Sequence, residues 1–64
     1  MKKYFYVTFK WSADDDVYCG NLCHAENEEA VKEKYSEYPW YTAREARPYE
    51  VEEAKRRGMP IIEA

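Results

Sequence analysis

The sequence is poor in the residues that build most catalytic and ligand-binding motifs. Its 64 residues include two glycines, two cysteines and one histidine. Two glycines cannot form the glycine-rich loop that surrounds a phosphate group. His24 is the one candidate for a general base near neutral pH, but its neighbour Cys23 would point to the opposite face of a strand. We therefore expect His24 to be structural or solvated, no cofactor or metal, and a protein that is not an enzyme.

Long apolar runs and an excess of basic charge are also absent. No stretch approaches the roughly 20 apolar residues of a membrane-spanning helix. The start Met1-Lys2-Lys3 imitates a signal peptide, but the run after it is short, rich in tyrosine and without a small-residue cleavage site. The formal net charge is −3, and this mild acidity disfavours non-specific binding to nucleic acid or membrane. We expect a cytoplasmic protein.

The cysteines and the aspartate run do not form a recognisable metal site. Cys19 and Cys23, four positions apart on a strand, would lie roughly 13 Å apart at ~3.3 Å per residue, too far for a disulfide. We expect two reduced thiols, and the alternative of a redox or zinc pair lacks a second pair of ligands. The run 14–16 is expected to be a solvated turn. Weak metal binding there is the alternative, without the spread of ligands found in a calcium-binding loop.

Aromatic residues, in contrast, are abundant: the chain has seven Tyr, two Trp and two Phe. With 45% hydrophobic and 36% charged residues the composition is that of a globular protein. A chain of this length makes a single domain, residues 1–64, with a small core.

The densest aromatic segment, residues 3–11, alternates between two sets of side chains. One set consists of Phe5, Val7, Phe9 and Trp11. The other consists of Tyr4, Tyr6, Thr8 and Lys10. Period-two alternation of residues that favour strands indicates a β-strand, and we expect the first set to face the core.

The remaining elements follow from caps, turns and periodicity. Asn27 is a suitable N-cap for a helix that Pro39 ends, and Pro48 and Gly58 suit the beginning and end of a second helix. Gly20 suggests a bulge. The expected elements are a turn at 12–16, a strand at 17–24, a strand at 40–46, a helix at 48–57 and a short strand at 61–62.

This order, β-β-α-β-α-β, predicts an α+β fold with a small, mainly antiparallel sheet and both helices packed on one face. Residues 3–11 form the most apolar strand, so we expect it in the centre, giving the order 2-1-3 for the first three strands. The sequence does not predict where the last strand joins.

The side chains of residues 3–11 that are not expected to face the core predict a row of outward-facing tyrosines. Tyr4 and Tyr6 would form it, joined by Tyr18 and Tyr41. Exposed Tyr side chains are enriched where proteins contact one another, so we expect a protein partner or self-association as a homodimer. Two alternatives stay open, which are cross-strand pairs on a solvated sheet face and cover by a helix of the same chain.

Charged residues supply an alternative function linked to nucleic acid. The basic residues are Arg44, Arg47, Arg56 and Arg57. Beside exposed aromatic side chains they could follow the phosphates of a single strand. The glutamates near the helix starts could instead mimic phosphates, as in an acidic inhibitor of a DNA-handling defence enzyme. Helix-dipole complementarity explains most of both sets without any partner.

Three stretches carry a resemblance, namely 1–9, His24-Ala25-Glu26, and 49–58 followed by 60–63. Together they resemble small uncharacterised proteins encoded on conjugative and phage-like mobile elements of gut Firmicutes. The resemblance implies a cytosolic accessory protein of such an element, which acts by binding a host protein or another protein of the element. It implies no catalytic residues.

Overall fold

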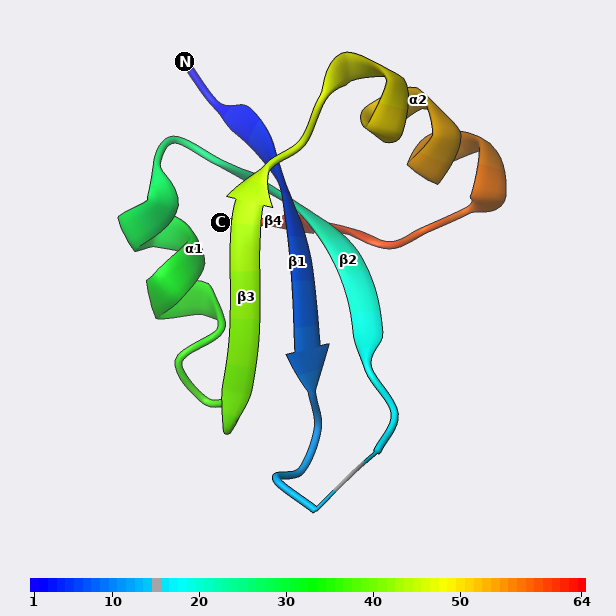
Figure 1. Ribbon diagram of the computed structural model, residues 1–64. Coiled ribbons are helices and arrows are strands. Elements are labelled where there is room, and N and C mark those ends of the chain that lie inside the picture. Colours follow the sequence, from blue (N-terminus) through cyan, green and yellow to red (C-terminus); the bar gives the residue numbers. More distant parts are fainter. Residues whose placement is uncertain (15) are drawn as a thin grey trace.

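The computed structural model describes residues 1–14 and 16–64, and within them the chain forms four strands and two helices (Figure 1). The strands are β1 (Lys3–Lys10), β2 (Cys19–Ala25), β3 (Trp40–Glu45) and β4 (Ile61–Glu63). The helices are α1 (Glu28–Lys34) and α2 (Pro48–Arg57). The predicted α+β class and the predicted order of elements are confirmed. Of the predicted turn at 12–16, Asp15 lies outside the described residues.

The strands form one mixed sheet in the order β3-β1-β2-β4. β1 lies between β2 and β3 and is antiparallel to both, which confirms the predicted 2-1-3 arrangement. β4 joins the far side of β2 in parallel, with Leu22 opposite Ile61. Segments from both ends of the chain therefore meet in one sheet.

The core lies between the sheet and α1. Phe5, Val7 and Phe9 are buried on this face, as predicted, against Val31 and Tyr35 of the α1 region. Complete burial of side chains of this size contributes roughly 1.5–3 kcal/mol each, so these residues account for much of the stability of the domain.

Trp11 was predicted to belong to this core, and that prediction is wrong. β1 ends at Lys10, and the Trp11 side chain beyond it is 65% exposed. Its ring contacts Phe9 and Tyr38 edge to face, with centroids 5.7 and 5.3 Å apart. Trp11 thus covers the margin of the core instead of entering it.

Both helices begin at the expected capping residues, but α1 ends at Lys34, so the prediction that Pro39 ends this helix is wrong. The chain turns away from the helix at Tyr35, whose ring is buried in the core. The Asn27 side chain accepts a hydrogen bond from the Ala30 backbone N–H at 2.9 Å, which satisfies a free donor of the first turn of α1. α2 starts at Pro48 and ends at Arg57, with Gly58 as its C-cap, as predicted. Gly58 has a φ of 75°, a left-handed conformation that glycine adopts without steric cost.

The helices lie on opposite sides of the sheet, and not on one face as expected (Figure 1). Val31 of α1 belongs to the Phe5 side. α2 lies on the Tyr6 side, where Lys55 reaches the Tyr4 ring and Ala54 lines a pocket with Tyr6. The second face of β1 carries large rings that can bury surface against a helix, and α2 packs beside two of them, Tyr4 and Tyr6.

The bulge predicted at Gly20 is also absent from the β1–β2 pairing. The register is regular from Lys3 opposite Ala25 to Phe9 opposite Cys19. A Cβ at Gly20 would lie 3.3 Å from the Tyr6 hydroxyl oxygen, so the glycine makes room for the Tyr6 ring.

Candidate functional site

The second face of the sheet carries the predicted tyrosine row, and α2 divides it into two halves. This face carries the side chains of the even-numbered residues of β1 and of the β2 and β3 residues that pair with them. The half beside α2, here called the covered half, contains Tyr4, Tyr6, Leu22, His24 and Arg44. The other half, here called the open half, contains Thr8, Lys10, Tyr18, Gly20, Trp40 and Thr42.

In the covered half, the Tyr4 ring contacts the imidazole of His24 and the ammonium group of Lys55. Its ring stacks on His24 with centroids 4.5 Å apart, and the Lys55 ammonium lies 5.3 Å from its centroid. The Nδ1 atom of His24 lies 3.0 Å from the Oε1 atom of Glu63, and the Oε2 atom of the same carboxylate accepts a hydrogen bond from Lys2 at 3.2 Å. Both contacts hold the pKa of Glu63 below its usual value. Tyr4 is therefore partly enclosed by its own chain.

Tyr6 is likewise partly covered. Arg44 lies over its ring at 5.3 Å and donates two hydrogen bonds to Glu50 of α2, at 2.8 and 2.6 Å. The Glu50 carboxylate also accepts from the Arg47 backbone N–H. These bonds lower the pKa of Glu50 to about 2, and the first cause is the Arg44 guanidinium. Leu22, opposite Tyr6, is fully buried.

A pocket of about 290 Å³ lies where α2 meets the covered half. Its charged lining consists of two ion pairs, Arg44 with Glu50 and Arg57 with Glu53. Because each cation already has a carboxylate partner, the pocket offers little net charge to a ligand.

The open half carries a cluster that we call the aromatic patch, made of Lys10, Tyr18 and Trp40. The Tyr18 and Trp40 rings meet edge to face with centroids 5.2 Å apart. The Lys10 ammonium lies 4.7 Å from the Tyr18 centroid and 5.9 Å from that of Trp40, within cation–π range. Tyr18 is 55% exposed and Trp40 is 41% exposed. These side chains form a preorganised surface of large rings around one positive charge.

Three of the four predicted tyrosines share this face, and Tyr41 does not. The β1–β3 register places Tyr41 opposite Phe9, on the core side, where its ring stacks on Tyr35 at 6.0 Å. The expectation that Tyr41 joins the outward row is therefore wrong. Trp40, one residue earlier, takes the place in the row that was assigned to Tyr41.

Sequence reasoning missed Trp40 because the register of β3 against β1 is a long-range property. The alternation within 40–46 separates Trp40 from Tyr41 but does not say which of them shares a face with Tyr6. One signal in the sequence favoured an exposed Trp40 side chain. Trp40 directly follows Pro39, at the first position of a strand, where neighbouring elements cover a side chain least.

The four arginines of the nucleic-acid alternative do not form one free basic surface. Arg44 and Arg57 each pair with a glutamate of α2. Arg47 and Arg56 are exposed. Two of the four charges are thus neutralised locally, and the remaining two are fewer than phosphate-binding proteins generally use.

Other chemistry is sparse within residues 1–14 and 16–64. No group of three or more metal-ligating side chains is present there. Cys19 and Cys23 are free thiols, as predicted, and burial raises the pKa of Cys23. In the same part of the chain no helix has the length and apolar character needed to cross a bilayer.

Comparison with known proteins gives no further indication of function. No protein-family model matches the chain, and neither the curated proteins nor the solved structures yield a match.

Proposed function

We propose that this protein is a small non-enzymatic protein-interaction module that binds its partner through the open half of its sheet. The observation that supports this most strongly is the aromatic patch, in which the exposed ring of Tyr18, just before β2, contacts that of Trp40 on β3, with Lys10 of β1 beside both. Tyr and Trp dominate the residues that contribute most to protein–protein binding energy. They bury a large area and lose little conformational entropy when they do so.

The chemistry of the patch indicates what the partner presents. Within residues 1–14 and 16–64 no carboxylate forms an ion pair with Lys10. A partner that places an aspartate or glutamate beside an apolar side chain would match both the ammonium group and the rings. Desolvation of the ammonium on binding would strengthen that pair relative to one at a fully exposed site.

This proposal shifts the expected contact surface along β1. Tyr4 and Tyr6 lie partly beneath side chains of α2 and β3 and are assigned mainly to the fold. Tyr18 stays in the contact surface and Trp40 joins it. The resemblance to proteins of mobile elements provides a context for such a partner, which would be a protein of the element or of its host.

The test compares partner capture by the wild-type protein and by Tyr18→Ser/Trp40→Ser, each used as bait in a lysate of the source organism. Any captured protein is then purified and its dissociation constant measured. The double variant should bind at least about 30-fold more weakly, since central aromatic residues contribute about 2 kcal/mol or more.

Tyr49→Ser is the matched control, because Tyr49 is 61% exposed on α2, outside the patch. It should bind as the wild type does. Equal binding by the double variant and the wild type would refute the proposed contact surface. Light scattering measures the molar mass of the purified protein in solution. It distinguishes a homodimer, in which the partner is a second copy, from a monomer whose partner is a different protein.

A further inference from the structure

The two edges of the sheet differ in their capacity to accept another strand. β4, at one edge, has three residues and follows Pro60, whereas β3, at the other, has six. A very short edge strand is one of the ways in which proteins prevent further pairing. β3 is long enough to accept a strand, and within residues 1–14 and 16–64 it pairs with β1 alone.

The hydrogen-bond pattern shows which backbone groups face this edge. The Ala46 N–H donates to the Tyr4 carbonyl oxygen at 2.8 Å, one step beyond the β1–β3 register. Bonded and non-bonded pairs alternate in an antiparallel ladder, so Thr42 also bonds to β1. The backbone groups of Tyr41 and Ala43 therefore point away from β1, and each presents one N–H and one C=O to the free edge.

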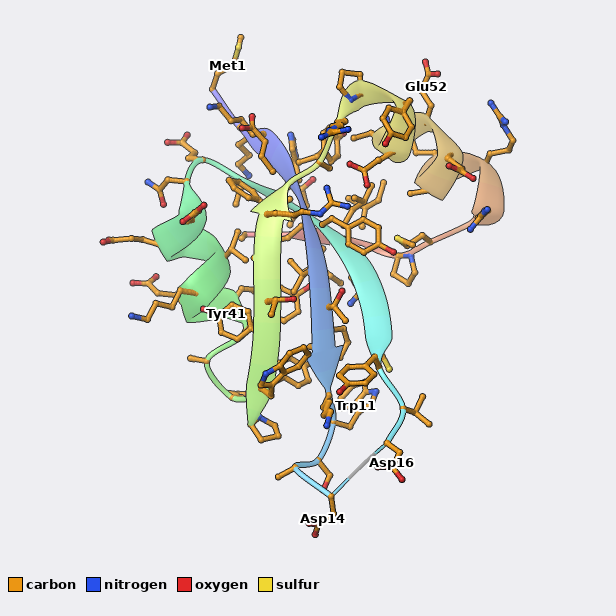
Figure 2. All side chains as sticks on the ribbon, viewed as in Figure 1. Met1, Trp11, Asp14, Asp16, Tyr41 and Glu52 are labelled. Carbon is orange, nitrogen blue, oxygen red and sulfur yellow. The ribbon has the colours of Figure 1, made fainter. Side chains whose placement is uncertain are left out.

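A groove of about 440 Å³ lies between this edge and α1. It is lined by Glu28, Glu29, Lys32, Tyr41, Thr42 and Ala43. The Tyr41 side chain projects from β3 toward α1 (Figure 2). The groove thus has strand backbone on one side and a helix face with two carboxylates and one ammonium group on the other.

From these observations we infer that the groove binds an extended peptide segment that carries a basic side chain. The segment pairs with the backbone of Tyr41 and Ala43 as an added strand of the sheet. Alternate side chains of such a strand point to the α1 side, where a lysine or arginine meets Glu28 and Glu29. Trp40 of the aromatic patch begins the same strand, but its side chain lies on the opposite face of the sheet from Tyr41, so this site does not depend on the patch.

A second copy of this chain fits the groove less well. Pairing of β3 with β3 about a two-fold axis would bring the α1 face of each copy to the same edge. The groove-facing residues of α1 are Glu28, Glu29 and Lys32, all exposed and charged. Four carboxylates would then face two ammonium groups, and the two helices would add only charged side chains to the apolar surface of Tyr41 and Ala43, whereas stable dimer interfaces have an apolar centre.

The test begins with peptides selected on the wild-type protein from a phage-displayed library of short random sequences. Selected peptides should carry a basic residue. When they bind, they should slow hydrogen exchange of the Tyr41 and Ala43 amides, which face the groove. The amide of Thr42 is already bonded to β1 and should change little.

Ala43→Pro tests the strand pairing directly. It removes an N–H at the free edge without removing a ladder hydrogen bond to β1, so the fold should persist. Peptide binding should weaken by about tenfold or more, since backbone pairing is interrupted. Tyr18→Ser/Trp40→Ser should leave peptide binding unchanged, which separates this site from the proposed function.

Glu28→Gln/Glu29→Gln tests the charge preference. It should weaken binding of the basic peptides by about fivefold, as expected for two exposed ion pairs. Glu52→Gln on α2 is the matched control and should have no effect. The inference is overturned if no peptides are enriched or if they perturb Tyr18 and Trp40 instead. It is also overturned if the Ala43 amide becomes protected with rising protein concentration alone, because the groove then binds a second copy.

Discussion

Tyr6 and Tyr18 lie on the same face of the same sheet and have different surroundings. Tyr6 is half-buried between Arg44, Gly20 and the α2 region. Tyr18 is 55% exposed. In the part of the chain that the structure describes, its ring contacts are with the Lys10 and Trp40 side chains of the patch. The difference comes from one helix, which covers the half of the face that carries Leu22 and leaves the rest open.

The comparison separates residues that hold the domain together from residues available to a partner. A chain of 64 residues has a small core, so rings placed on the second face can add stability if a helix packs against them. The covered half serves this purpose. The open half leaves the rings of Tyr18 and Trp40 exposed, and in the proposed function these rings contact a partner.

The largest expected difference between the halves concerns Leu22, which is fully buried in the covered half. Leu22→Ala should lower the free energy of unfolding by about 2–5 kcal/mol, through lost burial and the cavity left behind. Val17→Ala, at an exposed position beside the open half, should change it by less than about 0.5 kcal/mol. Denaturant titration measures both. Similar losses in the two variants would show that α2 does not seal the covered half.

A smaller difference is expected between the two tyrosines. Tyr6→Ser should cost about 1–3 kcal/mol, because it removes a half-buried ring and its contact with Arg44. Tyr18→Ser should cost about 0.5 kcal/mol or less, since it removes an exposed ring and its weak attraction to Lys10. Thermal unfolding of the two variants under the same conditions decides this. Equal destabilisation would mean that the open half also supports the fold.

The smallest effect concerns acid. The pKa of Glu50 is lowered to about 2, from an ordinary value of 4.5, mainly by Arg44. A depressed pKa in the folded state stabilises the fold above the unfolded pKa, and this contribution is lost as the pH falls from 4.5 toward 2. The wild type should therefore be more stable than Glu50→Gln at neutral pH, and the difference should shrink across this range.

Glu52→Gln provides the control for the acid experiment, since it removes a carboxylate of α2 that forms no ion pair with the described residues. Its stability relative to the wild type should show no comparable dependence over the same pH range. Denaturant titrations at several pH values measure both differences. A difference for Glu50→Gln that stays constant with pH would show that the Arg44 pair does not link α2 to the sheet.

Much of the local structure could be predicted because it depends on neighbours in the sequence. The alternation around Phe5 identified both the first strand and its buried face. Pro48 and Gly58 bracket α2 because each restricts the backbone at its own position. The capping role of Asn27 likewise requires only the first turn of the helix that follows it.

The candidate site could be predicted only in part, since it depends on strand register and helix placement. Tyr18 was assigned to the exposed row, but Trp40 was not, because the pairing of Lys10 with Trp40 joins residues far apart in the chain. Tyr41 was assigned to the wrong face for the same reason. The groove beside Ala43 was not foreseen, because it exists only where β3 and α1 come together.

The sequence by itself determined the α+β class, the order of the elements and the apolar side of β1, since each follows from periodicity and from backbone limits at individual residues. Only the tertiary structure decided which aromatic rings stay exposed. Both faces of β1 carry rings that can bury surface, so local chemistry does not choose between them. The choice was made by long-range contacts, above all the placement of α2 over Tyr6 and its ion pair with Arg44.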